Sequence, residues 1–448
     1  MTDTLRLPMA SARRSMGLKL LLVCALGLVM SVVALFVFLL LYDRTQRAEQ
    51  VSEEVGELVG GPQTFLGPVL GVPYVIPAEK PGESPRRGVW VVFPVTGDAQ
   101  ATTRSEVRRR SLFKTPVWQA DIGMNSRFDL AQAGALTPAG MMLDWDRAEF
   151  LVGVSDARGA RSDARLAVGG RTLALAPATL GQQAEGLEGI RLFGARIGDP
   201  RVLGQSLQAR AELKFSGARR LAVLPWAKTT TVRARGDWPH PGFDGGFLPT
   251  TRSVTADGFE ARWSVPFIAR DVPAEGDISL IGGLSKGALG ISFVEMTNPY
   301  QSVGRSLKYA PMFMGLVFLA FFIFETTTRR RVHPAQYLLI GLAQIVFYLL
   351  LLSISERIGF DPAFAVAATA TVGLISVYSG WVFESRRQGT VAMAAFSALY
   401  GLIYVLMRLE DLALLVGALA SFSAIASAMY FTRRMDWYGG AATLPEKA

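Results

Sequence analysis

The stretch that decides the fold class runs from Thr328 to Glu356 and reads TRRRVHPAQYLLIGLAQIVFYLLLLSISE. Three arginines open it, and an apolar run of about 20 residues follows, which is the length a helix needs to cross the hydrocarbon core of a bilayer. His333-Pro334 predicts the helix start, because proline is accepted in the first turn. The stretch therefore predicts a membrane span, and Gln344 near its middle raises the question whether the span also belongs to a site.

The composition of the whole chain also indicates a membrane protein. Of its 448 residues, 50% are hydrophobic and 19% are charged, whereas soluble domains carry about 25% charged residues. The net charge of +9 would suit a nucleic-acid partner. Many of the arginines flank apolar runs, however, where positive charge sets the orientation of a membrane protein. We therefore expect the lipid bilayer as a partner, and no nucleic acid.

Six apolar runs are long enough to cross a bilayer. The first, residues 18–42, is too long for the apolar region of a signal peptide and lacks an A-x-A site, so it predicts an uncleaved anchor. The other five predict a bundle over residues 306–431. They are Tyr309–Glu325, Pro334–Ser353, Pro362–Phe383, Val391–Met407 and Leu412–Phe431.

The arginines in the short loops orient these spans. One set of loops carries unopposed positive charge, and in the other set each arginine has an acid nearby. The first set holds the N-terminus, Arg329–Arg331, Arg386-Arg387 and Arg433-Arg434, and the second holds Arg357 and Arg408. Positive charge marks the cytoplasmic side, so we expect residues 1–17 and 432–448 in the cytoplasm. Residues 43–305 are then periplasmic, in a multi-pass protein of a bacterial inner (plasma) membrane.

The predicted periplasmic region has the patterns of β structure. Alternating apolar and polar residues indicate half-buried strands, a Gly-Gly pair indicates a two-residue hairpin, and a short apolar run indicates a buried strand. These stretches are Ser206–Phe215, Phe259–Val265, Gly169-Gly170 and Val89–Phe93. We expect a large all-β, sandwich-like domain, either single or divided near residues 180–190. A helix over Thr45–Leu58 would continue the first span into it.

Motifs for catalysis are weak in this sequence. Gly283–Gly287 (GLSKG) matches G-x-S-x-G, but a nucleophile elbow needs a later histidine, and His333 is expected across the membrane. His240 lies between two prolines, which is typical of a rigid connector. The single cysteine, Cys24, excludes a disulfide within the chain. We predict no catalytic residue, metal site or cofactor, and no enzymatic activity.

The most basic stretch of the predicted periplasmic region is a candidate binding surface. It contains Arg108, Arg109, Arg110 and Lys114. In one interpretation these residues face anionic lipid or lipopolysaccharide. In the other they form a solvated loop whose arginines pair with acids such as Asp144 or Asp146.

A second candidate is the pair Glu356 and Arg357 at the end of the opening stretch. The predicted topology places it at the periplasmic face. It either couples the bundle to the periplasmic domain or is a plain interfacial pair.

Polar residues within the spans suggest helix packing. Gln344, Ser376, Ser397, Ser421 and Ser423 are expected to satisfy one another between helices. The spans carry no centrally placed charge, whereas proton-coupled transporters usually keep one.

Four stretches of the chain together resemble one family. They are Arg108–Trp118, Trp238–Pro249, Asn298–Phe313 and His333–Phe360. The chain resembles the CreD family of bacterial inner-membrane proteins, also called cell envelope integrity proteins, along nearly its whole length. The resemblance implies one N-terminal span, a large periplasmic domain and a C-terminal bundle. It also implies a link to a two-component regulatory system, to colicin tolerance and to β-lactam responses, and it supplies no catalytic residue or cofactor.

Three functions remain open at this point. The first is a role in envelope integrity or the envelope stress response, by binding or scaffolding an envelope protein, lipid or peptidoglycan. The second is a transporter or lipid flippase that uses the bundle, and the third is a periplasmic-facing envelope hydrolase. The sequence does not indicate how many copies of the chain associate.

Overall fold

The computed structural model describes residues 16–78, 83–110, 112–180, 187, 189–293, 299–328, 332–408 and 413–433. The chain divides into two compact units. One, called the bundle below, comprises residues 1–47 and 297–448, and the other, called the β domain, comprises residues 48–296. Most of both predicted cytoplasmic ends, Arg329–Arg331 and most of the predicted division near residues 180–190 lie outside the described residues. The finer domain boundaries therefore stay predictions.

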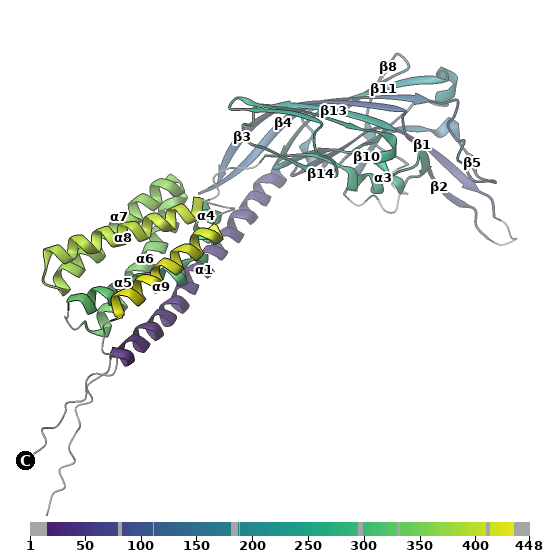
Figure 1. Cartoon of the computed structure of the whole chain (residues 1–448). Coiled ribbons are helices and arrows are strands. Elements are labelled where there is room, and N and C mark those ends of the chain that lie inside the picture. Colours follow the sequence, from purple (N-terminus) through teal and green to yellow (C-terminus); the bar gives the residue numbers. More distant parts are fainter. Residues whose placement is uncertain are drawn as a thin grey trace, which may run out of the picture. The chain divides into compact units, whose positions relative to one another are not determined.

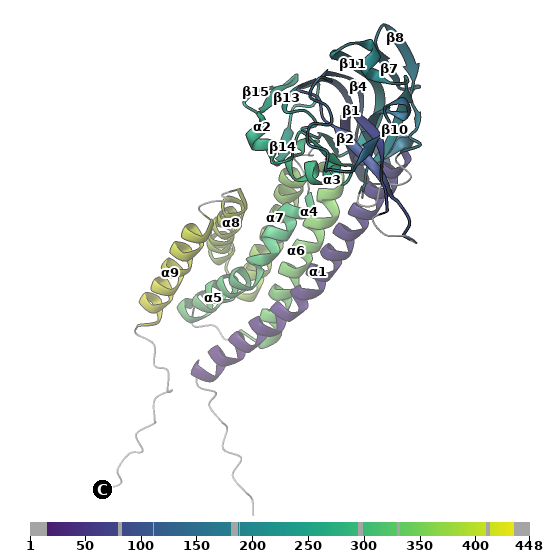
Figure 2. The same cartoon turned by 90° about the vertical axis from the view of Figure 1, so that its right-hand side faces the viewer.

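Long apolar helices make up the bundle (Figures 1 and 2). The described helices of this unit are α1 (Met16–Leu58, of which residues 48–58 belong to the β domain), α4 (Pro299–Lys308), α5 (Ala310–Thr328), α6 (Pro334–Ile358), α7 (Phe360–Val382), α8 (Arg386–Arg408) and α9 (Ala413–Thr432). Among the described residues, five of them are long and apolar enough to cross a membrane, and α9 contributes a further apolar stretch, Leu415–Tyr430. The predicted N-terminal span and C-terminal helical bundle are confirmed.

The start of α6 follows directly from its sequence. His333 is the N-cap and accepts a hydrogen bond from the Ala335 amide at 3.2 Å, while the His333 amide donates to Gln336 Oε1 at 3.0 Å. This reciprocal pair is a capping box, and Pro334 occupies the first turn as predicted. Gly359, with φ of +84°, ends α6 and lets α7 begin at the next residue.

Helix α1 is much longer than the predicted span. It continues without a break through Thr45–Leu58, which confirms the helix expected there. Two glycines with positive φ, Gly60 (+99°) and Gly61 (+61°), then turn the chain into the β domain.

Two sheets form the β domain. The strands of the first are β1 (Gln63–Ile76), β2 (Arg86–Val92), β5 (Met142–Leu143), β6 (Glu149–Val154), β9 (Ala176–Pro177), β10 (Arg191–Arg196), β12 (Arg220–Val223), β14 (Pro241–Gly245), β17 (Glu275–Asp277) and β18 (Leu289–Phe293). Their main path is β14-β18-β12-β1-β6-β10-β9, with β2 and β5 paired to β1, and β17 paired to β2. The second sheet has the order β15-β16-β13-β3-β4-β11-β7-β8. Its strands are β3 (Thr96–Arg110), β4 (Phe113–Asp129), β7 (Arg165–Val168), β8 (Arg171–Ala174), β11 (Ser206–Ala218), β13 (Thr229–Gly236), β15 (Thr251–Thr255) and β16 (Gly258–Val265).

The local strand predictions are confirmed. Strand β11 alternates exposed and buried residues through the predicted stretch, and β16 does the same from Phe259 to Val265. Gly169 and Gly170, both with positive φ, join antiparallel β7 and β8 as a two-residue hairpin. The run from Val89 to Phe93 is buried, mostly within β2.

Figure 1 shows the two sheets of the β domain stacked on each other. Aromatic side chains join these sheets in one core. Phe65 of β1 packs edge-on against Phe215 of β11 at 5.3 Å between ring centroids. Phe128 of β4 packs in the same way against Phe150 of β6 at 5.4 Å. Each pair has one ring from each sheet, so the inner faces interdigitate as in other sandwiches. The predicted sandwich-like β domain is confirmed.

Candidate functional site

The predicted basic surface lies at the end of a long hairpin. Strand β3 pairs with β4 over the whole length of β3, from Thr96–Arg127 to Arg110–Phe113. Four exposed basic side chains, called the basic tip below, surround the turn of this hairpin: Arg108, Arg109, Arg110 and Lys114. The interpretation of this segment as a solvated loop was wrong, because the cross-strand ladder holds it almost to the turn.

The arginines of the basic tip have different acidic partners from those expected. Arg108 Nε lies 2.7 Å from Glu106 Oε1, since residues two apart on a strand share a face. Arg110 Nη1 lies 2.7 Å from Glu54 Oε2, near the end of α1. The expected partner Asp144 lies instead 4.0 Å from Arg147. Exposed pairs of this kind contribute only about 0–1 kcal/mol, so they leave the arginines able to exchange partners.

Apolar side chains lie beside this charge. Val107 is 42% exposed and Leu112 is 40% exposed, next to the hairpin turn. The tip therefore offers both positive charge and apolar surface to a partner.

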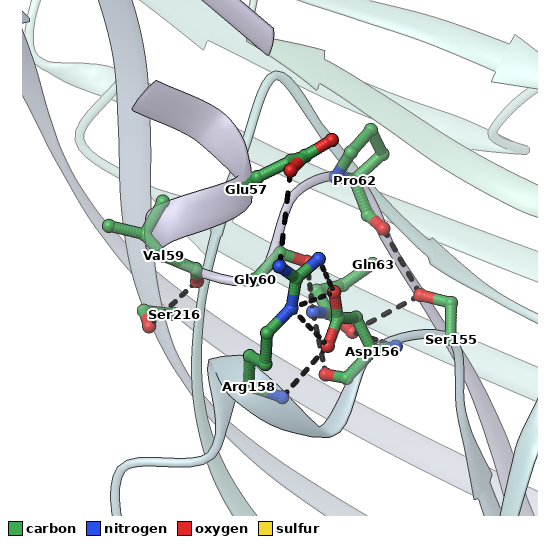
Figure 3. Close-up of polar contacts among 9 residues, drawn as sticks. All are labelled: Glu57, Val59, Gly60, Pro62, Gln63, Ser155, Asp156, Arg158 and Ser216. Carbon is green, nitrogen blue, oxygen red and sulfur yellow. Dashed lines mark hydrogen bonds and ion pairs between the residues drawn. The ribbon is translucent and has the colours of Figure 1, made fainter. Parts of the chain in front are cut away.

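A second polar centre fastens the end of α1 to the sandwich (Figure 3). Gln63 is fully buried, and its Nε2 donates to the carbonyl oxygens of Gly60, at 2.5 Å, and Asp156, at 2.9 Å. Its Oε1 accepts from the Ser155 hydroxyl at 3.2 Å. Ser216 donates to the carbonyl of Val59 at 3.0 Å. The first residues after α1 are thereby bonded to both sheets.

Arg158 completes this centre from the surface. Its guanidinium donates twice to Asp156 Oδ2, at 2.7 and 2.9 Å, and lies 4.0 Å from Glu57 of α1 (Figure 3). The hydrogen bond from Arg158 lowers the pKa of Asp156, against the opposing effect of partial burial. This junction was not evident from the sequence, because its parts come from three separate segments of the chain.

The bundle contains a buried ion pair that was not predicted from the sequence. Glu325 of α5 is 2% exposed and contacts Lys19 of α1 in a salt bridge. It also accepts from the Tyr337 hydroxyl at 2.8 Å and from the Val332 amide at 2.9 Å. Lys19 Nζ donates to the Val332 carbonyl at 2.7 Å. The available signal was an acid that directly follows the apolar run FFIF.

The two residues of the predicted coupling pair, Glu356 and Arg357, have different surroundings in the structure. Glu356 is half-buried and accepts from the Tyr300 hydroxyl of α4 at 3.1 Å. Arg357 is exposed. A role of this pair in coupling to the β domain stays a prediction.

The polar residues of the spans do not satisfy one another as expected. Ser423 donates to the carbonyl of Leu419 in its own helix, a bond that serine hydroxyls commonly form there, and Ser421 donates to Met312 Sδ. Ser397 is exposed. Gln344 and Ser376 are buried, and their side-chain polar atoms have no hydrogen-bond partner among the described residues.

Residues 15–438 match the family of inner membrane protein CreD. This chain belongs to the CreD family. Inner membrane protein CreD of Escherichia coli K12 is 30% identical over 404 residues, and the match covers 88% of each chain. The protein is accordingly a multi-pass inner membrane protein, embedded in the lipid bilayer.

A solved structure matches part of this CreD-family chain. A crystal structure from Legionella pneumophila, described as that of a nutrient-binding protein, covers 62% of this chain and 90% of its own. Its TM-score is 0.27 and its sequence identity 8%, so it carries no argument about fold or function.

The motifs considered for catalysis have ordinary structural places in the CreD-family chain. Ser285 is exposed in a 3-10 turn, Leu284–Gly287, that follows the short helix α3 (Leu280–Gly283), which is not a strand-to-helix elbow. The His240 carbonyl accepts from Trp238 Nε1 at 3.1 Å. Within the described parts of the chain, no three His, Cys, Asp or Glu side chains are grouped to hold a metal. CreD is not a known enzyme family.

Proposed function

We propose that this CreD-family protein supports envelope integrity by binding an anionic envelope component with the β3–β4 hairpin, and that it does so without catalysis. The observation that carries the proposal is the exposed basic tip. Residues 104–114 hold five basic residues and one acid, a net charge of +4. A basic residue near an anionic membrane surface contributes about 1 kcal/mol of attraction.

The exposed apolar residues favour a lipid-containing partner over a purely ionic one. Val107 and Leu112 would lose contact with water when the tip meets acyl chains or an acylated headgroup. The family resemblance and the charge of the short loops both support a periplasmic place for this hairpin. The protein would then hold or sense an envelope component there, while the bundle anchors it.

A charge-reversal experiment tests this function. Arg108→Glu with Arg109→Glu reverses the charge of two residues of the basic tip without altering the Arg110–Glu54 pair. The matched control is Arg171→Glu with Arg233→Glu, which reverses two exposed arginines elsewhere in the same sheet. We expect the tip variant to fail to restore envelope-stress and β-lactam resistance to a deletion strain, and the control to restore it, at equal membrane abundance.

A photo-crosslinking amino acid identifies the partner. Placed at Val107 in the tip, it should form adducts with envelope lipid or protein that the tip variant loses. Placed at Val202, which is 82% exposed elsewhere in the β domain, it should not. Equal adducts at both positions, or full complementation by the tip variant, would remove the basis of the proposal.

A further inference from the structure

A row of polar side chains runs along one buried face of α6. Tyr337, Gln344, Tyr348 and Ser355 are spaced by seven, four and seven residues, so they share a helix face. All four are at most 2% exposed. From the first to the last the helix rises about 27 Å, close to the roughly 30 Å of a hydrocarbon core. The row therefore extends through most of a membrane thickness inside the bundle.

A carboxylate lies at each end of this row. Tyr337 donates to the buried Glu325 at 2.8 Å. At the other end Ser355 is followed directly by Glu356, which accepts from Tyr300 at 3.1 Å. A carboxylate side chain is therefore near each end of the row.

Two neighbouring helices add polar groups to its middle. Tyr400 of α8 packs against Phe347 of α6 at 4.9 Å between ring centroids, and Phe347 in turn lies 5.0 Å from the Tyr348 ring. Ser376 of α7 is level with Gln344 to within about one turn, since the two helices are antiparallel and joined at Gly359.

These central groups have no hydrogen-bond partner in the part of the chain that the structure describes. The hydroxyls of Tyr348, Tyr400 and Ser376 and both polar atoms of the Gln344 amide lack a hydrogen bond to any described residue. Each buried polar group left unpaired costs about 1–3 kcal/mol, and four such residues would offset much of a typical folding free energy of about 5–15 kcal/mol. Buried water commonly satisfies such groups, with about three hydrogen bonds for each molecule.

We propose that this row binds a column of water along α6 that conducts protons between Glu325 and Glu356. A proton that enters at one carboxylate displaces another along the hydrogen-bonded chain, and one leaves at the other carboxylate, so no charge accumulates. A metal cation suits the row less well, because one amide and three hydroxyls supply few of the oxygen ligands that such an ion takes.

Proton flux into proteoliposomes tests the column. The full chain is reconstituted with a pH-sensitive dye inside, and a potassium diffusion potential drives protons inward. We expect flux above that of protein-free liposomes, and a fall of about tenfold for Gln344→Leu and for Tyr400→Phe, the factor for losing about one hydrogen bond along the path. Ser353→Ala on α6 and Ser397→Ala on α8 are matched controls, because both serines are exposed, and they should leave the flux unchanged.

X-ray footprinting of the unaltered protein tests the water directly. Radicals formed from bound water should oxidise Tyr348 and Tyr400 despite their burial, and should spare Phe322, which is also buried but lies outside the row. Flux equal to that of protein-free liposomes overturns conduction. Tyrosines as unreactive as Phe322 overturn the water column, and would mean that the side chains bond one another directly.

Discussion

At the scale of single residues, two adjacent glycines after α1 differ in the space around them. A Cβ on Gly60 would lie 2.6 Å from Gly159 Cα and 2.8 Å from Gln63 Nε2, whereas a Cβ on Gly61 would meet nothing within 4 Å. Both have positive φ, which costs a non-glycine residue about 1–2 kcal/mol. Only Gly60 adds a backbone collision to that cost.

This difference predicts a graded loss of stability. Gly60→Ala should lower the free energy of unfolding of the β domain by at least about 2 kcal/mol more than Gly61→Ala, since the close approach of two backbone segments gives little room to relax. Urea unfolding followed by tryptophan fluorescence measures both. Equal effects of the two variants would show that the junction adapts freely.

Asp156 predicts a dependence of stability on pH. Its pKa in the folded protein is lowered from 3.8, chiefly by the hydrogen bond from Arg158. The unfolded chain therefore binds the proton more readily, so this contribution is present above about pH 4 and is lost as the pH falls. We expect Asp156→Asn to lower the urea midpoint at pH 7, with a difference from the unaltered protein that shrinks below about pH 4. Asp257 lies at an exposed turn between β15 and β16. Asp257→Asn should therefore change the urea midpoint neither at pH 7 nor below about pH 4.

At the scale of helices and strands, local sequence patterns predict which elements form but not which distant residues they contact. The alternation in β11, the Gly-Gly turn after β7 and the His333-Pro334 start of α6 each depend on a few consecutive residues, and each was predictable. The Lys19–Glu325 pair was not, because its partners are 306 residues apart in the chain. The same holds for Glu54, which only the folded hairpin brings to Arg110.

The buried ion pair predicts a specific pattern of helix stability. Lys19→Leu leaves Glu325 as a buried charge without its counter-ion, and breaking such a pair costs about 3–5 kcal/mol. Adding Glu325→Gln should recover part of the loss, because the amide removes the charge yet still accepts from Tyr337. Thermal unfolding of the full chain in detergent measures the relative stabilities of the unaltered protein and the two variants. Asp361→Asn is the control, because its pair with Arg408 is exposed, and we expect a small effect. A double variant less stable than Lys19→Leu alone would contradict this account.

At the scale of the whole molecule, the division into helices and a β domain was predictable because membrane spans need long apolar runs. The order of the strands was not. Strand β1 pairs in parallel with β12, and β3 in parallel with β13, and nothing local to those segments indicates it. The lack of a hydrogen-bond partner for Gln344 among the described residues could not be predicted either, because the sequence shows that Gln344 is polar but not which groups surround it.

Topology is the whole-molecule property on which the proposed function depends, and the single cysteine makes it measurable. In a Cys24→Ser background, we expect Asp163→Cys in the β domain and Arg357→Cys to react with an impermeant maleimide in intact spheroplasts. Gln388→Cys should react only after lysis, because α7 separates it from Arg357 and the positive charge of its loop favours the cytoplasm. Lysed spheroplasts serve as the control for reactivity at all three positions. The inverted pattern would place the basic tip in the cytoplasm, where no periplasmic partner can reach it, and the binding proposal would fail whatever the affinity of the hairpin for anionic lipid.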